Sequence, residues 1–237
     1  MKGMKIFAAT MCATLLFTSC NMNNTAKGGL IGGGSGAAAG AGIGALFGKG
    51  KGAGIGAAVG SVVGAGVGVI VGRKMDKAKA EAERIANAKV EGVKDANGLD
   101  AVKVTFDSGI LFTTGSSTLS STAKSSLSQF ATNVLTKNTD MDVAIQGYTD
   151  NAGWKNSTAE QSRQKNQQLS LQRAQAVENY LKSCGVSGMQ IKSVDGLGEA
   201  NPVADNSTAA GKEQNRRVEV YMYASKAMIE EAGKAQN

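Results

Sequence analysis

Residues 143–150 read Val-Ala-Ile-Gln-Gly-Tyr-Thr-Asp, with Val143, Ile145 and Gly147 spaced two apart. This spacing predicts a β-strand with one buried face. Similar alternation predicts three more strands, near residues 102–106, 191–194 and 218–222. Apolar positions three and four apart predict two helices, one marked by Ala123, Leu127, Phe130 and Val134 and the other by Ala174, Val177, Leu181 and Cys184. The order βαβαββ indicates an α+β two-layer sandwich with both helices on one face of the sheet.

The composition excludes several classes of enzyme. The chain has 237 residues, enough for one or two domains, and contains no histidine. Catalytic triads that use an imidazole, zinc sites built on histidine and histidine proton switches are therefore excluded. We expect no metal and no cofactor.

The N-terminus has the pattern of a secretory signal peptide over residues 1–19. Lys2 and Lys5 precede an uncharged run of 12 residues at positions 6–17. This run is too short to span a bilayer, which takes about 20 apolar residues. The folded part of the chain is therefore expected outside the cytoplasm, where a nucleic-acid partner is not expected despite the formal net charge of +7.

A lipid anchor is predicted at Cys20. Residues 16–20, Leu-Phe-Thr-Ser-Cys, resemble the bacterial lipobox, in which the cysteine is diacylated and becomes the new N-terminus. Phe17 departs from this pattern, which usually has leucine there. The alternatives are ordinary signal cleavage or a retained anchor. Acyl chains on Cys20 would hold the protein on a membrane through a linker at residues 20–27.

Glycine occupies every fourth position from residue 28 to residue 72. On a helix this spacing forms a ridge that lets another backbone approach closely, as small residues do in membrane helices. Two uncharged halves, 30–47 and 53–71, would each be about 27 Å long, close to the hydrocarbon thickness. We predict a glycine-zipper helical hairpin that associates with membrane lipid and could form a homo-oligomer. The alternative is a flexible glycine-rich linker.

Residues 73–98 are expected to connect the zipper to the folded domain. They are rich in alanine and carry mixed charges, with Lys77 and Glu81 four residues apart. This pattern predicts a solvated helical spacer. The folded domain is expected at residues 99–223, followed by a C-terminal tail at 224–237.

Five motifs in the C-terminal half occur in a recognisable order. They are Val104 to Ser108 (VTFDS), Gly147 to Asp150 (GYTD), Asn166 to Ala174 (NQQLSLQRA), the segment from Gly196 to Thr208 that contains GLG, NP and NST, and Asn215 to Glu219 (NRRVE). Together they resemble the OmpA-like C-terminal domain. With the lipobox and the zipper, the chain is identified as a member of the OmpA-family lipoproteins. The resemblance implies non-catalytic binding of peptidoglycan through the meso-diaminopimelate of the stem peptide.

The resemblance also implies the site residues. Diaminopimelate presents an ammonium and a carboxylate on one carbon, so a receptor needs an anion beside a planar cation. By resemblance, Asp150 binds the ammonium, and the Arg173 guanidinium donates two parallel hydrogen bonds to the carboxylate. The other implied members are Asn166 and Thr149 as neutral hydrogen-bonding groups, Leu169 as a wall, and Asp107 and Arg216 as further lining residues. The alternative is that Asp150 and Arg173 form only a solvated structural pair.

Two features depart from the family pattern. Tyr148 stands where the family often has histidine, a position that is not expected to touch the ligand charges. Residues 152–165, which include Trp154, make the stretch between Asp150 and Asn166 longer than usual. This insertion borders the predicted site and could be a lid, a partner site or a surface loop.

These observations predict a tether, with the anchor in the outer membrane and the C-terminal domain on peptidoglycan in the periplasm. One alternative is a zipper oligomer that forms a membrane pore or an envelope-stress assembly. A stator-like function would need an intramembrane carboxylate, and residues 28–75 contain no Asp or Glu. An enzymatic function would depend on Ser121-x-x-Lys124, which matches the S-x-x-K motif of penicillin-binding proteins. The Lys-Thr-Gly and Ser-x-Asn motifs that accompany it in those enzymes are missing from the sequence.

Overall fold

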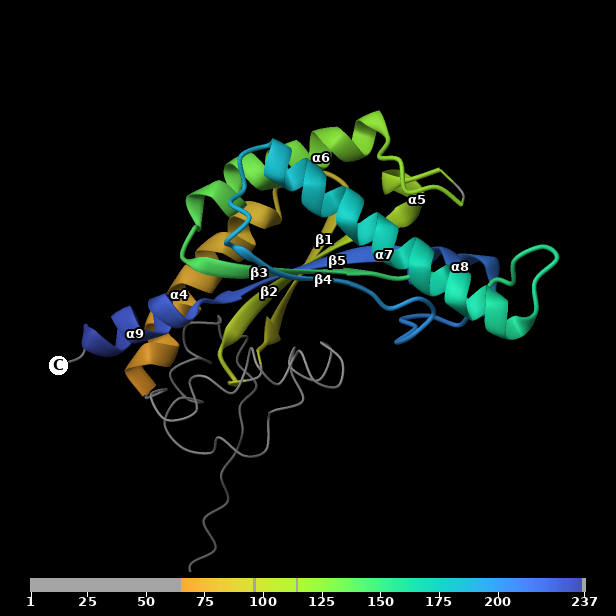
Figure 1. The fold of residues 1–237 in the computed structure, drawn as a ribbon. Helices are drawn as coiled ribbons and strands as arrows, with labels where there is room; N and C mark the ends of the chain where they lie inside the picture. Colours follow the sequence, from red (N-terminus) through yellow and green to blue (C-terminus); the bar gives the residue numbers. More distant parts are fainter. Residues whose placement is uncertain (1–64, 96, 114, 236–237) are drawn as a thin grey trace, which may run out of the picture.

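A computed structural model describes residues 65–235 except 96 and 114 (Figure 1). The signal peptide, Cys20 and the zipper up to residue 64 lie outside the described residues. The described chain forms a five-stranded sheet in the order β1-β2-β5-β3-β4, in which only β3 and β4 pair in parallel. The strands are β1 (Ala88–Lys94), β2 (Asp100–Asp107), β3 (Met141–Gly147), β4 (Ile191–Gly196) and β5 (Arg217–Ala224).

The helices cover one face of this sheet (Figure 1). They are α4 (Ala65–Ala82), α5 (Ser108–Leu111), α6 (Ser121–Asn133), α7 (Ala159–Ser183), α8 (Ala209–Asn215) and α9 (Lys226–Lys234), with a short 3-10 turn η2 (Leu135–Lys137) after α6. Alternate strand residues point toward α6 and α7 and build the core, where the rings of Phe106 and Phe130 meet edge to face at 5.7 Å. The predicted α+β two-layer sandwich is confirmed.

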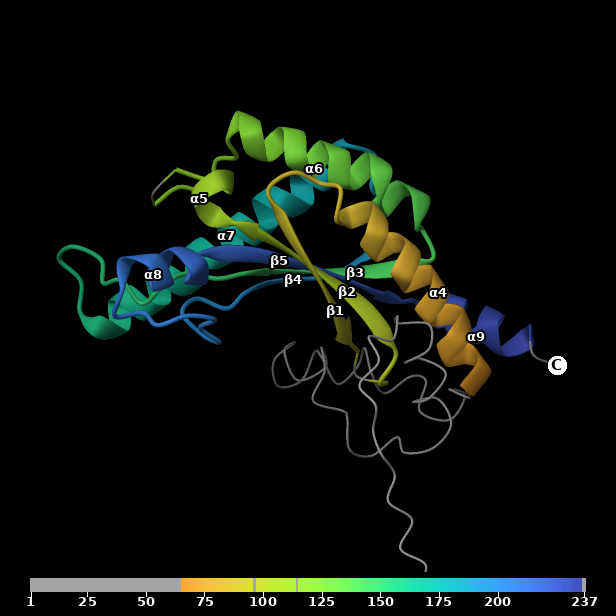
Figure 2. The ribbon, with the colours of Figure 1, turned by 180° about the vertical axis from the view of Figure 1, so that it is seen from behind.

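Helix α4 is part of the folded core, which differs from the predicted solvated spacer. Val67, Val71, Met75, Ala78 and Ala82 are spaced three and four apart and are all at most 2% exposed. This stripe packs on β2 and on α9, and Figure 2 shows α4 and α9 side by side. The last turns of the predicted zipper, from residue 65 to residue 72, therefore belong to a helix that packs on β2 and α9. The charges of α4 face outward and include Lys74, which pairs with Asp140.

The rest of the predicted spacer and tail is also structured. Strand β1 lies at the sheet edge and pairs with β2, with Val90 opposite Val104. Helix α9 buries Met228, Ile229 and Ala232 where a tail was expected. Within the described residues, the folded unit therefore includes residues ahead of the predicted boundary at 99. Among the described residues, no helix is both long and apolar enough to cross a membrane.

Candidate functional site

A cavity of about 720 Å³ lies where the ends of β3 and β5 meet the first half of α7. Residues 147–150 leave β3 there, and residue 216 leads into β5 from α8. This end of the sheet also carries α5 (Figure 1). Six of the seven predicted binding residues line the cavity: Thr149, Asp150, Asn166, Leu169, Arg173 and Arg216.

The seventh predicted residue, Asp107, lies elsewhere. Its carboxylate accepts a hydrogen bond from the Gly109 backbone N–H at 2.6 Å and caps the short helix α5. It also lines a second cavity of about 400 Å³, together with Lys103 and Glu219. Asp107 is therefore the N-cap of helix α5 and does not line the first cavity.

Asp150 pairs with Arg216. The Arg216 Nη1 donates to the Asp150 Oδ2 at 2.6 Å, and the other carboxylate oxygen accepts from the Ala152 backbone N–H at 3.0 Å. The Asp150 side chain is 10% exposed, whereas that of Arg216 is 36% exposed. The expected alternative, a pair between Asp150 and Arg173, is not formed.

Arg173 is held in the cavity wall without a carboxylate partner among the described residues. Its Nε donates to the Ser116 carbonyl at 3.0 Å, and its guanidinium lies over the Phe112 ring, 5.2 Å from the centroid. The residue is 3% exposed. Burial, reinforced by the nearby Arg216 and opposed by Asp150, lowers its pKa from the usual value. An anion that entered the cavity would meet a guanidinium that is already desolvated.

Asn166 has a structural role that the sequence did not indicate. Its Oδ1 accepts from the Trp154 indole Nε1 at 2.7 Å, and its Nδ2 donates to the Ala152 carbonyl at 3.1 Å. The side-chain amide thus holds the start of the insertion, residues 152–154, at the cavity wall. The insertion forms a loop and the first turns of α7, which begins with a capping box between Thr158 and Gln161.

The insertion reaches the cavity itself, since Trp154 and Lys155 line it. Thr149 also lines the cavity, and its hydroxyl is buried and has no hydrogen-bond partner among the described residues. Ser108, another lining residue, has a similarly unpartnered hydroxyl among the described residues. Among the described residues there is no cluster of His, Cys, Asp or Glu that could hold a metal ion.

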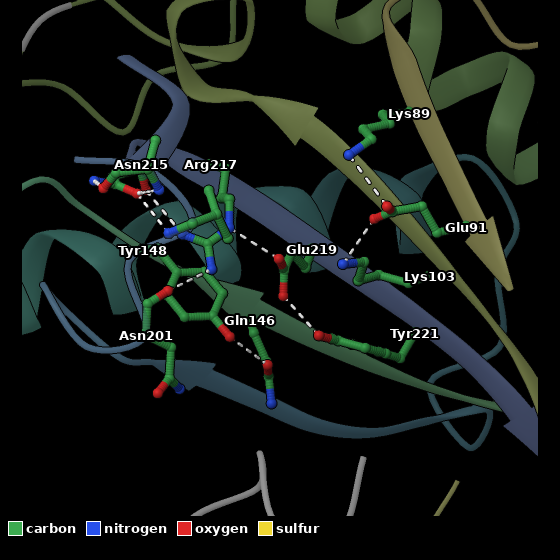
Figure 3. Close-up of polar contacts among 12 residues, drawn as sticks. Lys89, Glu91, Lys103, Gln146, Tyr148, Asn201, Asn215, Arg217, Glu219 and Tyr221 are labelled. Atoms are coloured by element: carbon green, nitrogen blue, oxygen red, sulfur yellow. Dashed lines mark hydrogen bonds and ion pairs between the residues drawn. The ribbon is translucent and has the colours of Figure 1, made fainter. Parts of the chain in front are cut away.

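A buried polar network on the other face of the sheet supports these strand ends (Figure 3). The Arg217 Nε donates to Glu219 at 2.8 Å, and the Tyr221 hydroxyl donates to the other oxygen of Glu219 at 2.6 Å. The Arg217 guanidinium also stacks on Tyr148, whose hydroxyl donates to Gln146 at 2.7 Å. Burial raises the pKa of both tyrosines, which keeps them neutral donors. Sequence reasoning missed this network, although polar residues alternating along β5 were a visible signal.

Comparison with known proteins agrees with this architecture. Residues 111–216 match the OmpA family, and residues 1–76 match the YMGG-like Gly-zipper family. The chain contains an OmpA-family domain. The resemblance predicted from the motifs is thereby confirmed, and the glycine repeat is a recognised zipper sequence.

Individual relatives extend the comparison. The chain is 36% identical over 129 residues to the probable lipoprotein YiaD of Escherichia coli, which covers 54% of each chain. It is 47% identical over 81 residues to the peptidoglycan-binding protein ArfA of Mycobacterium tuberculosis, covering 34% of this chain and 22% of ArfA. Only about half of YiaD and about a fifth of ArfA are thus matched. The solved cell wall anchor of the T6SS from Pseudomonas aeruginosa aligns with a TM-score of 0.50 at 27% identity, covering 64% of this chain and 97% of that chain.

Proposed function

We propose that this OmpA-family protein is a non-catalytic envelope lipoprotein that tethers the outer membrane to peptidoglycan by binding the diaminopimelate of the stem peptide. The single observation that carries the proposal is the cavity in which Asp150 lies beside two guanidinium groups, those of Arg173 and Arg216. The peptidoglycan-binding name of ArfA and the cell wall anchor of the T6SS support the same class of ligand.

The chemistry of the free head of diaminopimelate matches these charges. Its ammonium needs an anion, and Asp150 is the carboxylate that lines the cavity. Its carboxylate needs a donor that forms two parallel hydrogen bonds, which a guanidinium provides. The Arg173 guanidinium is held in place by Ser116 and Phe112, and the hydrogen bond from Arg216 orients the Asp150 carboxylate. In a lysine-type stem peptide the lysine side chain carries an ammonium without a carboxylate, so it would leave Arg173 without a carboxylate partner.

The Ser121-x-x-Lys124 motif lies outside the cavity on which this proposal rests. Ser121 and Lys124 are exposed on the first turn of α6, next to the N-cap Ser120, and neither lines the cavity. The outer-membrane anchor through acylated Cys20 and the zipper completes the tether in this proposal.

Co-sedimentation with sacculi tests the proposal. The full chain in detergent is pelleted with diaminopimelate-type sacculi, with lysine-type sacculi and without sacculi, at moderate salt. We expect pelleting with the first kind only, and displacement by free diaminopimelate but not by 1,5-diaminopentane, which carries two ammonium groups and no carboxylate. A wild type that stays in the supernatant with diaminopimelate-type sacculi contradicts the proposal.

Matched variants test whether the charges of Asp150 and Arg173 contribute to binding. Asp150→Asn and Arg173→Gln should each weaken binding about ten- to hundredfold, the usual worth of a hydrogen bond to a charged group. The Arg173→Lys variant should also bind weakly, because lysine keeps the positive charge but cannot donate two parallel hydrogen bonds to the ligand carboxylate. Arg163→Gln is the control, since Arg163 is an exposed arginine of the same helix that pairs with Glu160. Thermal unfolding of each variant checks that the fold is retained.

A further inference from the structure

The insertion places a rigid aromatic side chain at the cavity. The Trp154 backbone N–H donates to Ser162 at 3.0 Å, and its indole N–H donates to Asn166 at 2.7 Å. The Lys165 ammonium lies over the ring, 5.8 Å from its centroid, and also donates to Ser157 at 2.8 Å. Contacts from α7 and from the loop therefore hold Trp154 in one orientation, half-buried at the cavity wall.

The next residue, Lys155, brings an unused positive charge to the same cavity. Lys155 is exposed and lines the cavity, and its ammonium makes no ion pair or hydrogen bond with any described residue. The charged side chains that line the cavity are then one carboxylate, Asp150, and three cations, Arg173, Arg216 and Lys155. A ligand that brings one ammonium and one carboxylate leaves this excess of positive charge uncompensated.

We propose that Lys155, on the platform formed by Trp154, is a second subsite that binds a further carboxylate of the same stem peptide. The proposal rests on the proposed function and extends it. Asp150 and Arg173 take the free head of diaminopimelate, and Lys155 takes a carboxylate further along the peptide. The three methylenes between the two heads of diaminopimelate are apolar and suit the face of an indole ring. The site then selects stem peptides whose second carboxylate is free over those in which it is amidated.

Trp154 is the single tryptophan of the chain, so its fluorescence reports binding directly at this loop. The full chain is titrated with free diaminopimelate, with a stem tripeptide that carries all its carboxylates, and with two tripeptides amidated singly at the diaminopimelate C-terminus or at the preceding glutamate. We expect the unmodified tripeptide to bind more tightly than one of its amidated forms. The amidated form that loses affinity identifies the carboxylate.

Charge variants separate the second subsite from the first. Lys155→Gln should weaken binding of the unmodified tripeptide about fivefold, near the upper end for a solvent-accessible ion pair, and leave the weaker amidated form unchanged. Lys155→Arg should restore the affinity. Lys124→Gln removes the same charge from the exposed face of α6 and should have no effect.

The outcomes distinguish the two proposals. If the wild type binds none of the ligands, the proposed function fails and the subsite fails with it. If the wild type binds diaminopimelate and all three tripeptides equally, only the second subsite is overturned. The same holds if Lys155→Gln has no larger effect on the affinity for any ligand than Lys124→Gln has.

Discussion

The Arg217 guanidinium stacks on the Tyr148 ring, with 3.7 Å between Cζ and the ring centroid. The two residues are also joined through their backbones, since the Tyr148 N–H donates to the Arg217 carbonyl at 2.9 Å. Tyr148 directly precedes Thr149 and Asp150, and Arg217 directly follows Arg216. The stack on one face of the sheet therefore fixes the spacing of the Asp150 and Arg216 charges on the other.

Replacing Arg217 should destabilise the domain strongly. Arg217→Met leaves the Glu219 carboxylate, which is 3% exposed, buried without its cation. Breaking one side of a buried ion pair typically costs about 3–5 kcal/mol, so we expect a loss of this size in urea unfolding. Adding Glu219→Gln should recover part of it. Arg163→Met on the exposed face of α7 is the matched control, and a cost below about 1 kcal/mol for Arg217→Met would contradict a structural role.

Close packing of α7 on β3 gives a second prediction. A Cβ at Gly147 would overlap the Ser170 carbonyl oxygen, so Gly147→Ala must push the helix away from the strand. Because Arg173 lies one turn beyond Ser170, we expect weaker binding to sacculi as well as a loss of about 1–3 kcal/mol of stability. Gly188→Ala is the control, since its Cβ would meet only the flexible end of Lys182 at 3.4 Å. Equal stability of the two variants would show that α7 has room to shift.

Most strands of the sheet could be predicted because apolar residues alternate clearly along them. Strand β1 and helix α4 were missed because their apolar patterns are weak or masked by other residues. In β3 and β5 one face is apolar at every second residue, so their strands were evident from the sequence. β1 reads Ala-Lys-Val-Glu-Gly-Val-Lys at a half-exposed edge, where charged residues obscure the alternation. In α4, the glycine register of the zipper concealed the apolar stripe that contains Val71 and Met75.

Six of the seven residues predicted for the candidate site line one cavity, but the pairings between them could not be predicted. The motifs brought Asp150 and Arg173 to one cavity because they lie at a strand end and on the helix packed against it. The partner of Asp150 is Arg216, which depends on the turn between α8 and β5 and on side-chain conformations that no spacing specifies. The same holds for Asn166, whose amide is occupied by Trp154, a residue of the insertion.

The place of α4 in the folded unit can be tested with two methionines. Met75 is fully buried and Met189 is 84% exposed. We expect Met75→Ala to lower the free energy of unfolding by about 2–5 kcal/mol, the usual cost of such a core truncation, and Met189→Ala to leave it nearly unchanged. Urea unfolding followed by circular dichroism measures both. Equal effects would mean that the sandwich is stable without α4.

A buried carboxylate in the turn between β1 and β2 predicts a dependence of stability on pH. Asp95 is 4% exposed, and one of its oxygens accepts hydrogen bonds from the Asn97 and Leu99 backbone N–H groups at 2.8 and 2.9 Å. Burial outweighs these bonds and raises the pKa of Asp95 above its usual value. The folded state therefore binds the proton more tightly than the unfolded state, and ionisation of Asp95 destabilises the fold as the pH rises through the folded-state pKa.

Asp95→Asn should consequently be more stable than the wild type at pH 7, because an amide oxygen accepts the same two hydrogen bonds without a buried charge. The difference should shrink as the pH falls and vanish below about pH 3, where the wild-type carboxyl is protonated in both states. Asp205→Asn provides a control of opposite sign, since hydrogen bonds from Ser207 lower the pKa of Asp205. That variant should be less stable than the wild type at neutral pH, with the gap closing in acid. Urea unfolding at a series of pH values measures both, and an Asp95→Asn variant less stable than the wild type at pH 7 would mean that the two hydrogen bonds outweigh the cost of burial.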